Sequence, residues 1–316
     1  MYYIQLLFGL FLLIIGGNAL VGSSVLLANR WRVSKLWIGL IVLGLGTSLP
    51  ELSTSLVAQY RNVPGVAIGN VLGANIANIL LVLGIAALIR PIKFHMASFQ
   101  RDAIFLLLST IVLAFALLRT EIDSTMGALM CMTLAFYLYY SYKTDRAQVE
   151  KNVEQANVAL ADRMDISTKT LLLILLSGIV IVLFGAHVVV EQTINIQTEL
   201  HVLEIVTGLT IVALGTSLPE LATAIVASKK GHSDMAVGNI VGANIYNALL
   251  ILGVTALIMP DPVTVPVSRE SDVIMMSLAT LLFLFIGFAR GKIGRKTGSA
   301  FICIYLLYML YLGIHP

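Results

Sequence analysis

The chain is divided into apolar stretches that are each about as long as a helix must be to cross a lipid bilayer. Hydrophobic residues make up 58% of the sequence and charged residues only 12%. An ordinary soluble domain carries about 25% charged residues, so that class of protein is excluded. We therefore expect an all-α polytopic membrane protein with ten transmembrane helices. The predicted spans are 3–22, 36–58, 64–88, 102–119, 124–142, 170–190, 204–227, 233–258, 272–289 and 298–314.

The basic residues between the spans predict how the chain is oriented, because short cytoplasmic loops are enriched in lysine and arginine. If the N-terminus lies outside, seventeen of the twenty lysine and arginine residues fall in inside loops, and only Arg61, Arg119 and Arg269 fall outside. We therefore expect a multi-pass protein of the plasma membrane (the cell inner membrane) with both termini extracytoplasmic. The longest polar stretch, 143–169, is then a short cytoplasmic linker between the fifth and sixth spans.

Two long segments of the chain have nearly the same sequence. Residues 44–91 begin with GLGTSLPELSTSLVA and continue through AIGNVLGANIANILLVLG. Residues 213–260 begin with ALGTSLPELATAIVA and continue through AVGNIVGANIYNALLILG, at a constant offset of 169 residues. Internal similarity of this kind indicates a repeated structural unit. We expect two five-helix repeats, 1–142 and 170–316, joined by the linker.

An odd number of spans in each repeat makes the second copy enter the membrane from the opposite side. The basic residues agree, because the second span runs outward to Arg61 whereas the seventh runs inward to Lys229 and Lys230. The two repeats are therefore predicted to have inverted topology. This architecture is typical of secondary transporters, in which ions and substrates bind near the bilayer midplane.

The repeated GTSLPE motif places a proline in the middle of a span. Proline has no N–H, and its ring clashes with the carbonyl four residues earlier, so Pro50 should free the carbonyl of Gly46 and Pro219 that of Gly215. Glycine makes local unwinding easier at these positions. Free carbonyls at membrane depth are tolerated only where protein covers them or a water-filled cavity reaches them. A bound cation would satisfy them.

Two acidic residues, Glu51 and Glu220, lie deep within predicted spans, one helical turn beyond Thr47 and Thr216 respectively. No lysine or arginine lies at the same depth, and an unpaired carboxylate in the membrane interior is costly. Two carboxylates balance one divalent cation. Calcium, which takes roughly six to eight oxygen ligands, would find them in the carboxylates, the threonine oxygens and the freed carbonyls. The absence of histidine and cysteine from the motif disfavours softer metals.

The second part of the repeated motif carries glycines and asparagines. Gly69 and Gly73 are four residues apart, as are Gly238 and Gly242, a spacing that lets two helix backbones approach closely. Four amides either form hydrogen bonds between helices or line the site, and the sequence leaves both alternatives open: Asn70, Asn75, Asn239 and Asn244. The remaining two, which lie one turn deeper, are expected to line the site: Asn78 and Asn247.

The paired GTSLPE segments and the GN…GAN…N segments that follow them resemble the two α-repeats of the cation/calcium exchanger superfamily. The chain as a whole resembles a prokaryotic sodium/calcium exchanger-type antiporter. The resemblance implies exchange of calcium for sodium by alternating access, with the first and sixth spans sliding past the core. Calcium and sodium are then transported ions rather than cofactors, and no cofactor is expected. The expected surroundings are the lipid bilayer, with no nucleic acid and no obligatory protein partner.

The resemblance also implies roles for individual residues. Glu51 and Glu220 would be calcium ligands, and oxygens of Thr47 and Thr216 would complete their site. Flanking sodium sites would take contributions from Ser48, Ser217, Gly44, Ala213, Asn78 and Asn247. Sodium and calcium would then compete for the two carboxylates.

Two features depart from the family pattern. Prokaryotic members commonly carry serine where this chain has Ala74 and Ala243, and some members carry aspartate where it has Asn247. The flanking sites therefore have fewer oxygen ligands, which leaves the coupling ion and the stoichiometry open. The calcium ligands are intact.

Three other functions compete with sodium-coupled exchange. Coupling to protons or to another cation is the nearest alternative, because a glutamate in the membrane interior can carry a proton. A cation channel could use the same carboxylates and carbonyls, but channels are usually symmetric oligomers rather than internally repeated chains. An enzyme is not expected, because the sequence shows no nucleophile paired with a base.

Overall fold

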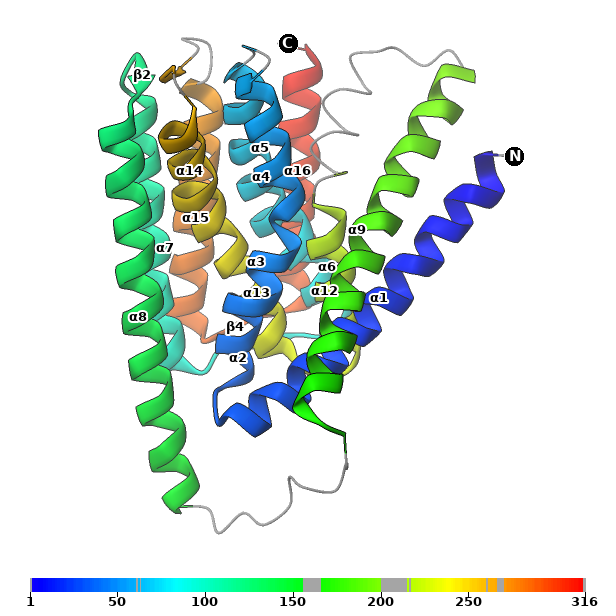
Figure 1. Ribbon diagram of the computed structural model, residues 1–316, viewed down its shortest axis with the longest axis vertical. Helices are drawn as coiled ribbons and strands as arrows, with labels where there is room; N and C mark the ends of the chain where they lie inside the picture. The colour runs from blue at the N-terminus through cyan, green and yellow to red at the C-terminus, as the bar shows by residue number, and fades with distance from the viewer. Residues whose placement is uncertain are drawn as a thin grey trace.

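The computed structural model describes residues 2–60, 62, 64–155, 166–199, 215, 217–259, 261–265 and 270–314. In this part of the chain, eight helices are long and apolar enough to cross a membrane, and they stand side by side in one bundle (Figure 1). The protein is therefore mostly helical and multi-pass, as the sequence predicts. The eight spans are Tyr2–Trp31, Lys35–Tyr60, Pro64–Ile89, Met96–Leu117, Thr168–Val189, Ser233–Ile258, Glu270–Arg290 and Arg295–Ile314.

The first half of the chain contains helices, π-helical segments (labelled η) and two short strands. Its elements are α1 (Tyr2–Trp31), α2 (Lys35–Ile38), η1 (Gly39–Leu43), α3 (Gly44–Thr47), α4 (Leu49–Tyr60), α5 (Pro64–Ala77), η2 (Asn78–Val82), α6 (Leu83–Ile89), β1 (Ile92–Lys93), α7 (Met96–Leu117), β2 (Glu121–Ile122) and α8 (Ser124–Gln155). Helix α8 carries the fifth predicted span and continues as a helix beyond residue 142 into the predicted linker.

The described elements of the second half follow the same order as their counterparts in the first. They are α9 (Thr168–Glu199), α12 (Leu218–Lys229), α13 (Ser233–Tyr246), η4 (Asn247–Ile251), α14 (Leu252–Ile258), β3 (Val263–Thr264), α15 (Glu270–Arg290), β4 (Lys292–Ile293) and α16 (Arg295–Ile314). Helix α12 is the described end of the seventh predicted span, whose first residues lie outside the described part of the chain. The count of ten spans therefore stays a prediction.

The repeat seen in the sequence is also a repeat of structure. Helices α4 and α12, α5 and α13, η2 and η4, and α6 and α14 begin and end at residues exactly one repeat offset apart. Two antiparallel strand pairs connect the halves: β1 with β4, where Ile92 pairs with Ile293, and β2 with β3, where Ile122 pairs with Val263. Because β3 precedes α15 and β4 follows it, the two pairs lie at opposite ends of the bundle (Figure 1). Two copies inserted in opposite directions would produce this arrangement.

The second span is interrupted next to Pro50, where the sequence predicts a break. Helix α3 ends at Thr47, Ser48 leaves the helical conformation with φ −85° and ψ 6°, and α4 begins at Leu49. Ser217 has nearly the same backbone conformation, with φ −86° and ψ 4°, immediately before α12. The predicted local break is therefore confirmed in the first copy, and Ser217 shows the same conformation in the described part of the second. A ring without an N–H at Pro50 and at Pro219 accounts for it.

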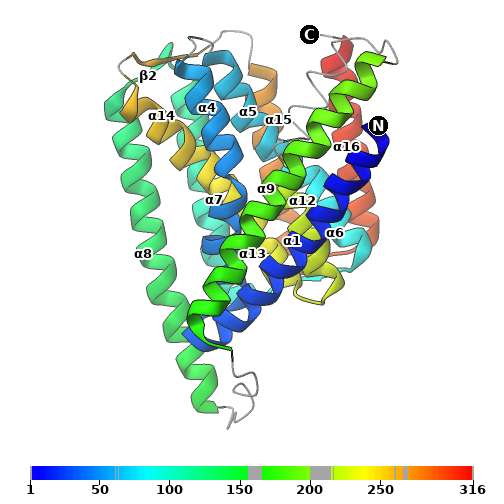
Figure 2. The same ribbon diagram turned by 45° about the vertical axis from the view of Figure 1, so that its right-hand side comes forward.

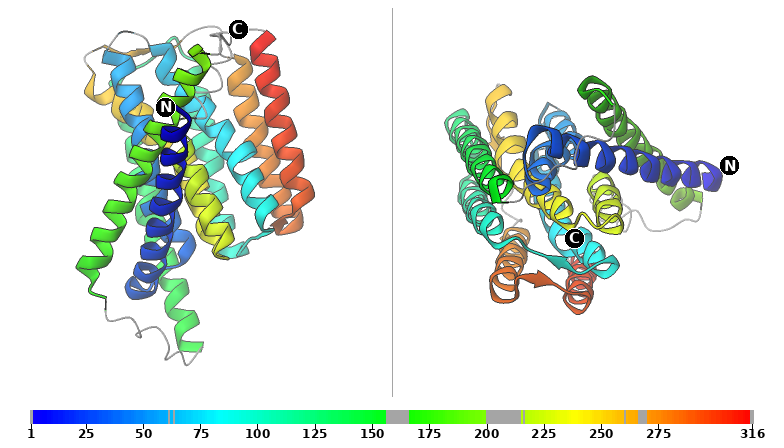
Figure 3. Two further views of the ribbon diagram at one scale, coloured as in Figure 1. Left: turned by 90° about the vertical axis from the view of Figure 1, so that its right-hand side faces the viewer. Right: turned by 90° about the horizontal axis from the view of Figure 1, so that it is seen from below.

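Helices α1 and α9, which occupy equivalent places in the two halves, cross each other on one side of the bundle (Figures 1 and 2). Seen from below, α1 extends away from the other helices with α9 alongside (Figure 3). Glycines permit this packing: a Cβ atom on Gly16 would lie 2.7 Å from Cγ2 of Val182, and one on Gly178 would lie 3.1 Å from the backbone nitrogen of Leu20. We call these two helices the α1–α9 pair.

Helix α13 lies directly against the backbone of α2 and η1. Cβ atoms added to Gly238 and Gly242 would collide with the carbonyl oxygens of Leu36 and Leu40, and one added to Gly39 would collide with that of Met235. The predicted role of Gly238 and Gly242 in close backbone approach is therefore confirmed. This contact brings the GN…GAN…N segment of the second half onto the span that carries Glu51.

We expect Gly238→Ala to destabilise the protein, because the new methyl group meets the Leu36 carbonyl and the Leu40 nitrogen lies only 3.0 Å away. Overpacking of this kind costs about 1–3 kcal/mol and should lower the apparent melting temperature in detergent. The matched control is Gly294→Ala, because an added Cβ there has nothing within 4 Å. Equal melting temperatures for the two variants would contradict the backbone contact.

Candidate ion-binding site

The two glutamates of the repeated motif meet inside the bundle. Glu51 lies in the first turn of α4 and Glu220 in the first turn of α12, and both side chains are completely buried. They are close enough for their charges to repel each other. Among the described residues, neither carboxylate forms an ion pair with a basic side chain. The structure thus brings the two predicted acidic ligands together.

The helix breaks position these carboxylates and the carbonyls around them. Each glutamate follows a break, so its carboxylate lies at a helix N-terminus, where the backbone N–H groups favour negative charge. On the other side of the first break, α3 ends at Thr47. Since Pro50 cannot donate, the Gly46 carbonyl lacks the usual helical bond from that position. The break therefore supplies both a site for an anion and backbone oxygens for a cation.

Many buried polar atoms of the motif lack a hydrogen-bond partner in the described part of the chain. They include both carboxylate oxygens of Glu51 and of Glu220, the hydroxyls of Ser48 and Ser217, the amide oxygen of Asn78, and both amide atoms of Asn247. About nine in ten buried polar groups in proteins are satisfied. A group of unsatisfied oxygens around two carboxylates is therefore an arrangement that a bound cation would complete.

Thr47 and Ser48 lie beside the carboxylate of Glu220, across the boundary between the two halves. The Thr47 hydroxyl donates to the carbonyl of Leu43 at 2.9 Å and lies 3.3 Å from the amide oxygen of Asn239. Because its proton is engaged, its oxygen is available to a cation. Gly44 is also buried, and a Cβ there would lie 3.1 Å from the backbone nitrogen of Ala243. The predicted equivalents in the second copy, Thr216 and Ala213, lie outside the described residues.

Asn70 and Asn239 hold the turns that carry the glutamates. The Asn70 amide donates to the backbone carbonyl of Glu51 at 3.1 Å. The Asn239 amide donates to the Thr223 hydroxyl at 2.9 Å, and that hydroxyl lies 3.0 Å from the Glu220 carbonyl. These bonds favour the interhelical alternative for both asparagines. Thr223 is not among the residues that the sequence predicts for the site; its place one turn after Pro219 and opposite a repeated asparagine was the available signal.

Three of the other four asparagines connect the two halves. The amide of Asn78 donates to the side-chain oxygen of Asn244 at 3.0 Å, and the amide of Asn244 donates to the backbone carbonyl of Asn75 at 3.2 Å. Asn75 also places its amide 3.7 Å from the sulfur of Met276. Asn78 and Asn247 are the first residues of the π-helical segments η2 and η4. Single π-helical turns within α-helices are frequent at functional sites.

The chemistry of this site suits a hard cation. Its candidate ligands are two carboxylates, hydroxyls, amides and backbone carbonyls, all of which coordinate through oxygen. The described residues contain no group of three or more histidine, cysteine, aspartate or glutamate side chains that could hold a metal ion. Ala74 and Ala243 are fully buried in the same helices and offer no hydroxyl. The site is therefore rich in neutral oxygens but limited to two formal charges.

Comparison with known proteins identifies the family. Residues 1–143 and 170–313 match the family described as "Sodium/calcium exchanger protein". The chain belongs to this family. The match covers both halves and omits most of the polar segment between them, and it makes the chain a member of a family of transporters rather than of enzymes.

Similar members of the sodium/calcium exchanger protein family extend over almost the whole chain. The inner membrane protein YrbG of Escherichia coli is 32% identical over 313 residues, which cover 96% of each protein. The sodium/calcium exchanger MaX1 of Methanosarcina acetivorans is 30% identical over 344 residues, covering 98% of each. A solved structure of the sodium–calcium exchanger NCX_Mj, soaked with Na⁺ and Sr²⁺, superposes with a TM-score of 0.83 at 30% identity, covering 98% of this chain and 99% of that one.

The two carboxylates predict how calcium changes stability. We expect calcium to raise the melting temperature of the detergent-solubilised protein, since a ligand at about 100 times its Kd adds about 2.7 kcal/mol. Glu51→Gln and Glu220→Gln should abolish most of this increase. Without calcium, the same variants should melt at a higher temperature than the parent, because one of two adjacent buried charges has been removed.

The matched control is Glu191→Gln, because the Glu191 side chain is 58% exposed on α9. This variant should keep the full calcium response. An undiminished calcium response in Glu51→Gln and Glu220→Gln would show that calcium binds elsewhere.

Proposed function

We propose that this protein is a secondary-active antiporter that exchanges calcium for sodium across the membrane by alternating access. The observation that carries the proposal is the pair Glu51 and Glu220: two buried carboxylates, one from each half, without a basic partner among the described residues. They belong to a chain of the sodium/calcium exchanger protein family. The proposed site lies at the midplane, where the two helix breaks meet.

The charge of the site explains why transport would be coupled. Two bare carboxylates in a low-dielectric interior repel each other strongly and have lost their hydration. Switching the empty site from one open state to the other is therefore costly. A site neutralised by one calcium ion or by sodium ions can switch. Each crossing requires a cation, so the outward movement of one ion depends on the inward movement of the other.

We propose the following ligands. Glu51, Glu220 and the oxygens of Thr47 and Thr216 bind calcium, whereas the flanking positions contribute to sodium binding: Ser48, Ser217, Gly44, Ala213, Asn78 and Asn247. The unsatisfied hydroxyls of Ser48 and Ser217 and the unsatisfied amide of Asn247 support this assignment. Asn78 donates a hydrogen bond to Asn244, whereas Asn247 has no partner among the described residues. The two flanking positions are therefore unequal.

Alternating access would use the α1–α9 pair. These two helices pack mainly against each other, and α1 also contacts α12, where a Cβ on Gly17 would lie 3.2 Å from Cγ2 of Val226. Small residues at this contact allow one surface to slide past the other. In the proposed orientation both termini are extracytoplasmic and the segment between α8 and α9 is cytoplasmic, as the positions of the basic residues predict.

Coupling to protons remains a second candidate for a specific reason. Ala74 and Ala243 are buried and remove two hydroxyls from the surroundings of the flanking sites. A site with fewer neutral oxygens holds sodium less well, whereas a carboxylate can bind a proton without further ligands. A channel has no comparable support.

The deciding experiment is calcium uptake into liposomes that contain the purified protein. With sodium inside and sodium-free buffer outside, we expect rapid calcium uptake that collapses when the sodium gradient is dissipated. Glu51→Gln and Glu220→Gln should each lower the rate by about 100-fold or more, because each removes half of the charge that binds calcium. Glu191→Gln, with its exposed side chain, should exchange at the parent rate.

Two further arms separate the alternatives. A pH gradient alone should drive little uptake; uptake driven by pH and indifferent to sodium would replace sodium coupling by proton coupling. Calcium flux that needs no counter-ion would indicate a channel. Full activity in the glutamine variants would disprove the two-glutamate site.

A further inference from the structure

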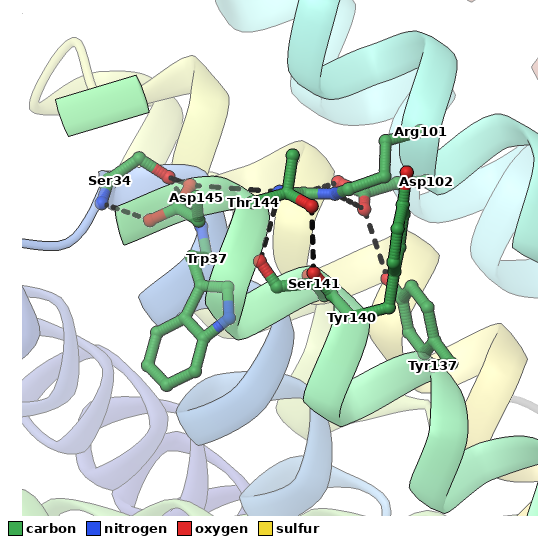
Figure 4. A network of polar contacts seen from close by, with 9 residues as sticks. All are labelled: Ser34, Trp37, Arg101, Asp102, Tyr137, Tyr140, Ser141, Thr144 and Asp145. Carbon is green, nitrogen blue, oxygen red and sulfur yellow. Dashed lines mark hydrogen bonds and ion pairs between the residues drawn. The ribbon is translucent and has the colours of Figure 1, made fainter. Parts of the chain in front are cut away.

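A second buried group of charged side chains lies outside the candidate ion-binding site. It is formed at the end of the bundle where α1 joins α2 and where α8 extends furthest (Figures 1 and 4). We call it the Arg101 network; its members are Arg101 and Asp102 on α7, Tyr137 and Asp145 on α8, and Ser34 before α2. Tyr137 and Asp145 are completely buried, and Asp102 and Arg101 are 3% and 7% exposed.

Arg101 connects α7 with α8. Its Nε and Nη2 atoms donate to the two carboxylate oxygens of Asp102 at 2.7 and 2.9 Å, a bidentate pairing. Its Nη1 atom donates to the backbone carbonyl of Ser141 at 3.2 Å and lies 3.9 Å from Oδ1 of Asp145. The Tyr137 hydroxyl donates to Asp102 at 3.2 Å. Paired geometry of this kind fixes orientation as well as contributing energy.

Asp145 extends the network to the start of the second span. Its Oδ2 atom accepts a bond from the backbone N–H of Ser34 at 2.8 Å, and its Oδ1 atom accepts one from the Ser34 hydroxyl at 2.5 Å. The Ser34 oxygen in turn accepts a bond from the backbone N–H of Trp37 at 3.0 Å, which caps α2. A carboxylate from α8 thus binds the N-terminus of α2, where negative charge is favoured. This span leads through η1 and α3 to Glu51.

Among the residues that the structure describes, the second half repeats only part of this network. The bond between Tyr137 and Asp102 recurs in the second half, where the Tyr308 hydroxyl donates to Asp272 at 2.7 Å. The residue before Asp102 is Arg101, whereas the residue before Asp272 is the uncharged Ser271. The tyrosine–aspartate bond is therefore found in both halves, whereas the arginine that links it to Asp145 is found in the first.

The network lies next to the joint between α2 and the α1–α9 pair. Helix α1 ends at Trp31, and Arg32 takes a left-handed conformation with φ 53°, which reverses the chain direction before Ser34. On the far side of this joint, Arg30 donates to the backbone carbonyl of Ile166 at 2.8 Å and to Thr168 at 3.1 Å, so the end of α1 is tied to the start of α9. One side of the joint is thus held to α9 and the other to α8.

We propose that Asp145 is a positioning residue of the exchange cycle, which anchors the N-terminus of α2 to α8 while the α1–α9 pair moves about the turn at Arg32. The anchor keeps Glu51 opposite Glu220 in every state, so that motion of α1 is not passed on to the ion ligands. This proposal rests on the proposed exchange function. The attachment of the N-terminus of α2 to α8 can be measured separately from transport.

The anchor is tested by distances between pairs of spin labels. Both native cysteines are first replaced by alanine, and labels are attached at Lys35 and Lys143 to report α2 against α8, or at Asn29 and Lys143 to report α1 against α8. We expect the Lys35–Lys143 distance to be narrow and equal in sodium and in calcium, and the Asn29–Lys143 distance to differ between them. Asp145→Ala should broaden the Lys35–Lys143 distribution. The matched control, Tyr308→Phe, removes a bond at the opposite end and should leave it narrow.

Exchange kinetics provide the second readout. Asp145→Asn and Ser34→Ala should reduce the maximal exchange rate by about tenfold, the effect of losing one charge-assisted hydrogen bond, with an unchanged half-saturating calcium concentration. The double variant should be no slower than the slower single variant, because both residues act through one bond. The milder Ser34→Ala variant keeps the test valid if Asp145 variants fold poorly.

Three outcomes would overturn the anchor: a Lys35–Lys143 distribution that stays narrow in Asp145→Ala, an unchanged maximal rate, or a loss of rate due entirely to weaker calcium binding. Failure of the parent protein to exchange calcium for sodium would instead disprove the proposed function, and the distance measurement would still decide whether Asp145 holds α2.

Discussion

Two carboxylates buried side by side in the membrane interior are the constraint to which the rest of this structure is fitted. Glu51 and Glu220 come from opposite halves of the chain and have no basic partner in its described part. In a medium of low dielectric constant, such a pair is unfavourable unless fixed dipoles and a mobile cation compensate it. The helix breaks before Pro50 and Pro219 place both carboxylates at helix N-termini, which supplies the dipoles. The cation is left to be supplied from solution, and this requirement is what makes the site suited to transport.

Close backbone packing allows so polar a site to exist within an apolar bundle. Gly39, Gly238 and Gly242 bring α2, η1 and α13 into contact with no side chains between them, so the unsatisfied oxygens are shielded from lipid. The amides of Asn70 and Asn239 then hold the glutamate turns, directly in one copy and through Thr223 in the other. Hydrogen bonds in such surroundings do not compete with bonds to water, and this makes them effective at fixing geometry. The site is therefore rigid in its supports and incomplete only in its cation ligands.

The sequence predicted the parts of this structure that depend on local chemistry. Spans follow from the length of apolar runs, the breaks from proline, and the paired glutamates from the repeat. The Arg101 network was not predicted, because Ser34, Arg101 and Asp145 lie on three separate segments, and Asp145 stands among the alternating charges of an apparent solvated linker. The π-helical segments at Asn78 and Asn247 were not predicted either, since the identity of the residues does not distinguish a π-turn from an α-turn. The hydrogen-bond partners of the asparagines depend on which helix faces which, and the sequence does not give that arrangement.

Each half supplies one buried glutamate to the proposed site, and the halves differ at its periphery. A strictly symmetric inverted repeat would give its inward-open and outward-open states the same free energy, because each state would be the other turned over. The tyrosine–aspartate bond keeps this symmetry, with Tyr137 and Asp102 matched by Tyr308 and Asp272. The branch through Arg101 to Asp145 breaks it, because the residue before Asp272 is the uncharged Ser271 where the first half has Arg101. In the proposed cycle, an asymmetric frame of this kind would give the two states different free energies, while the proposed site keeps one glutamate from each half in both.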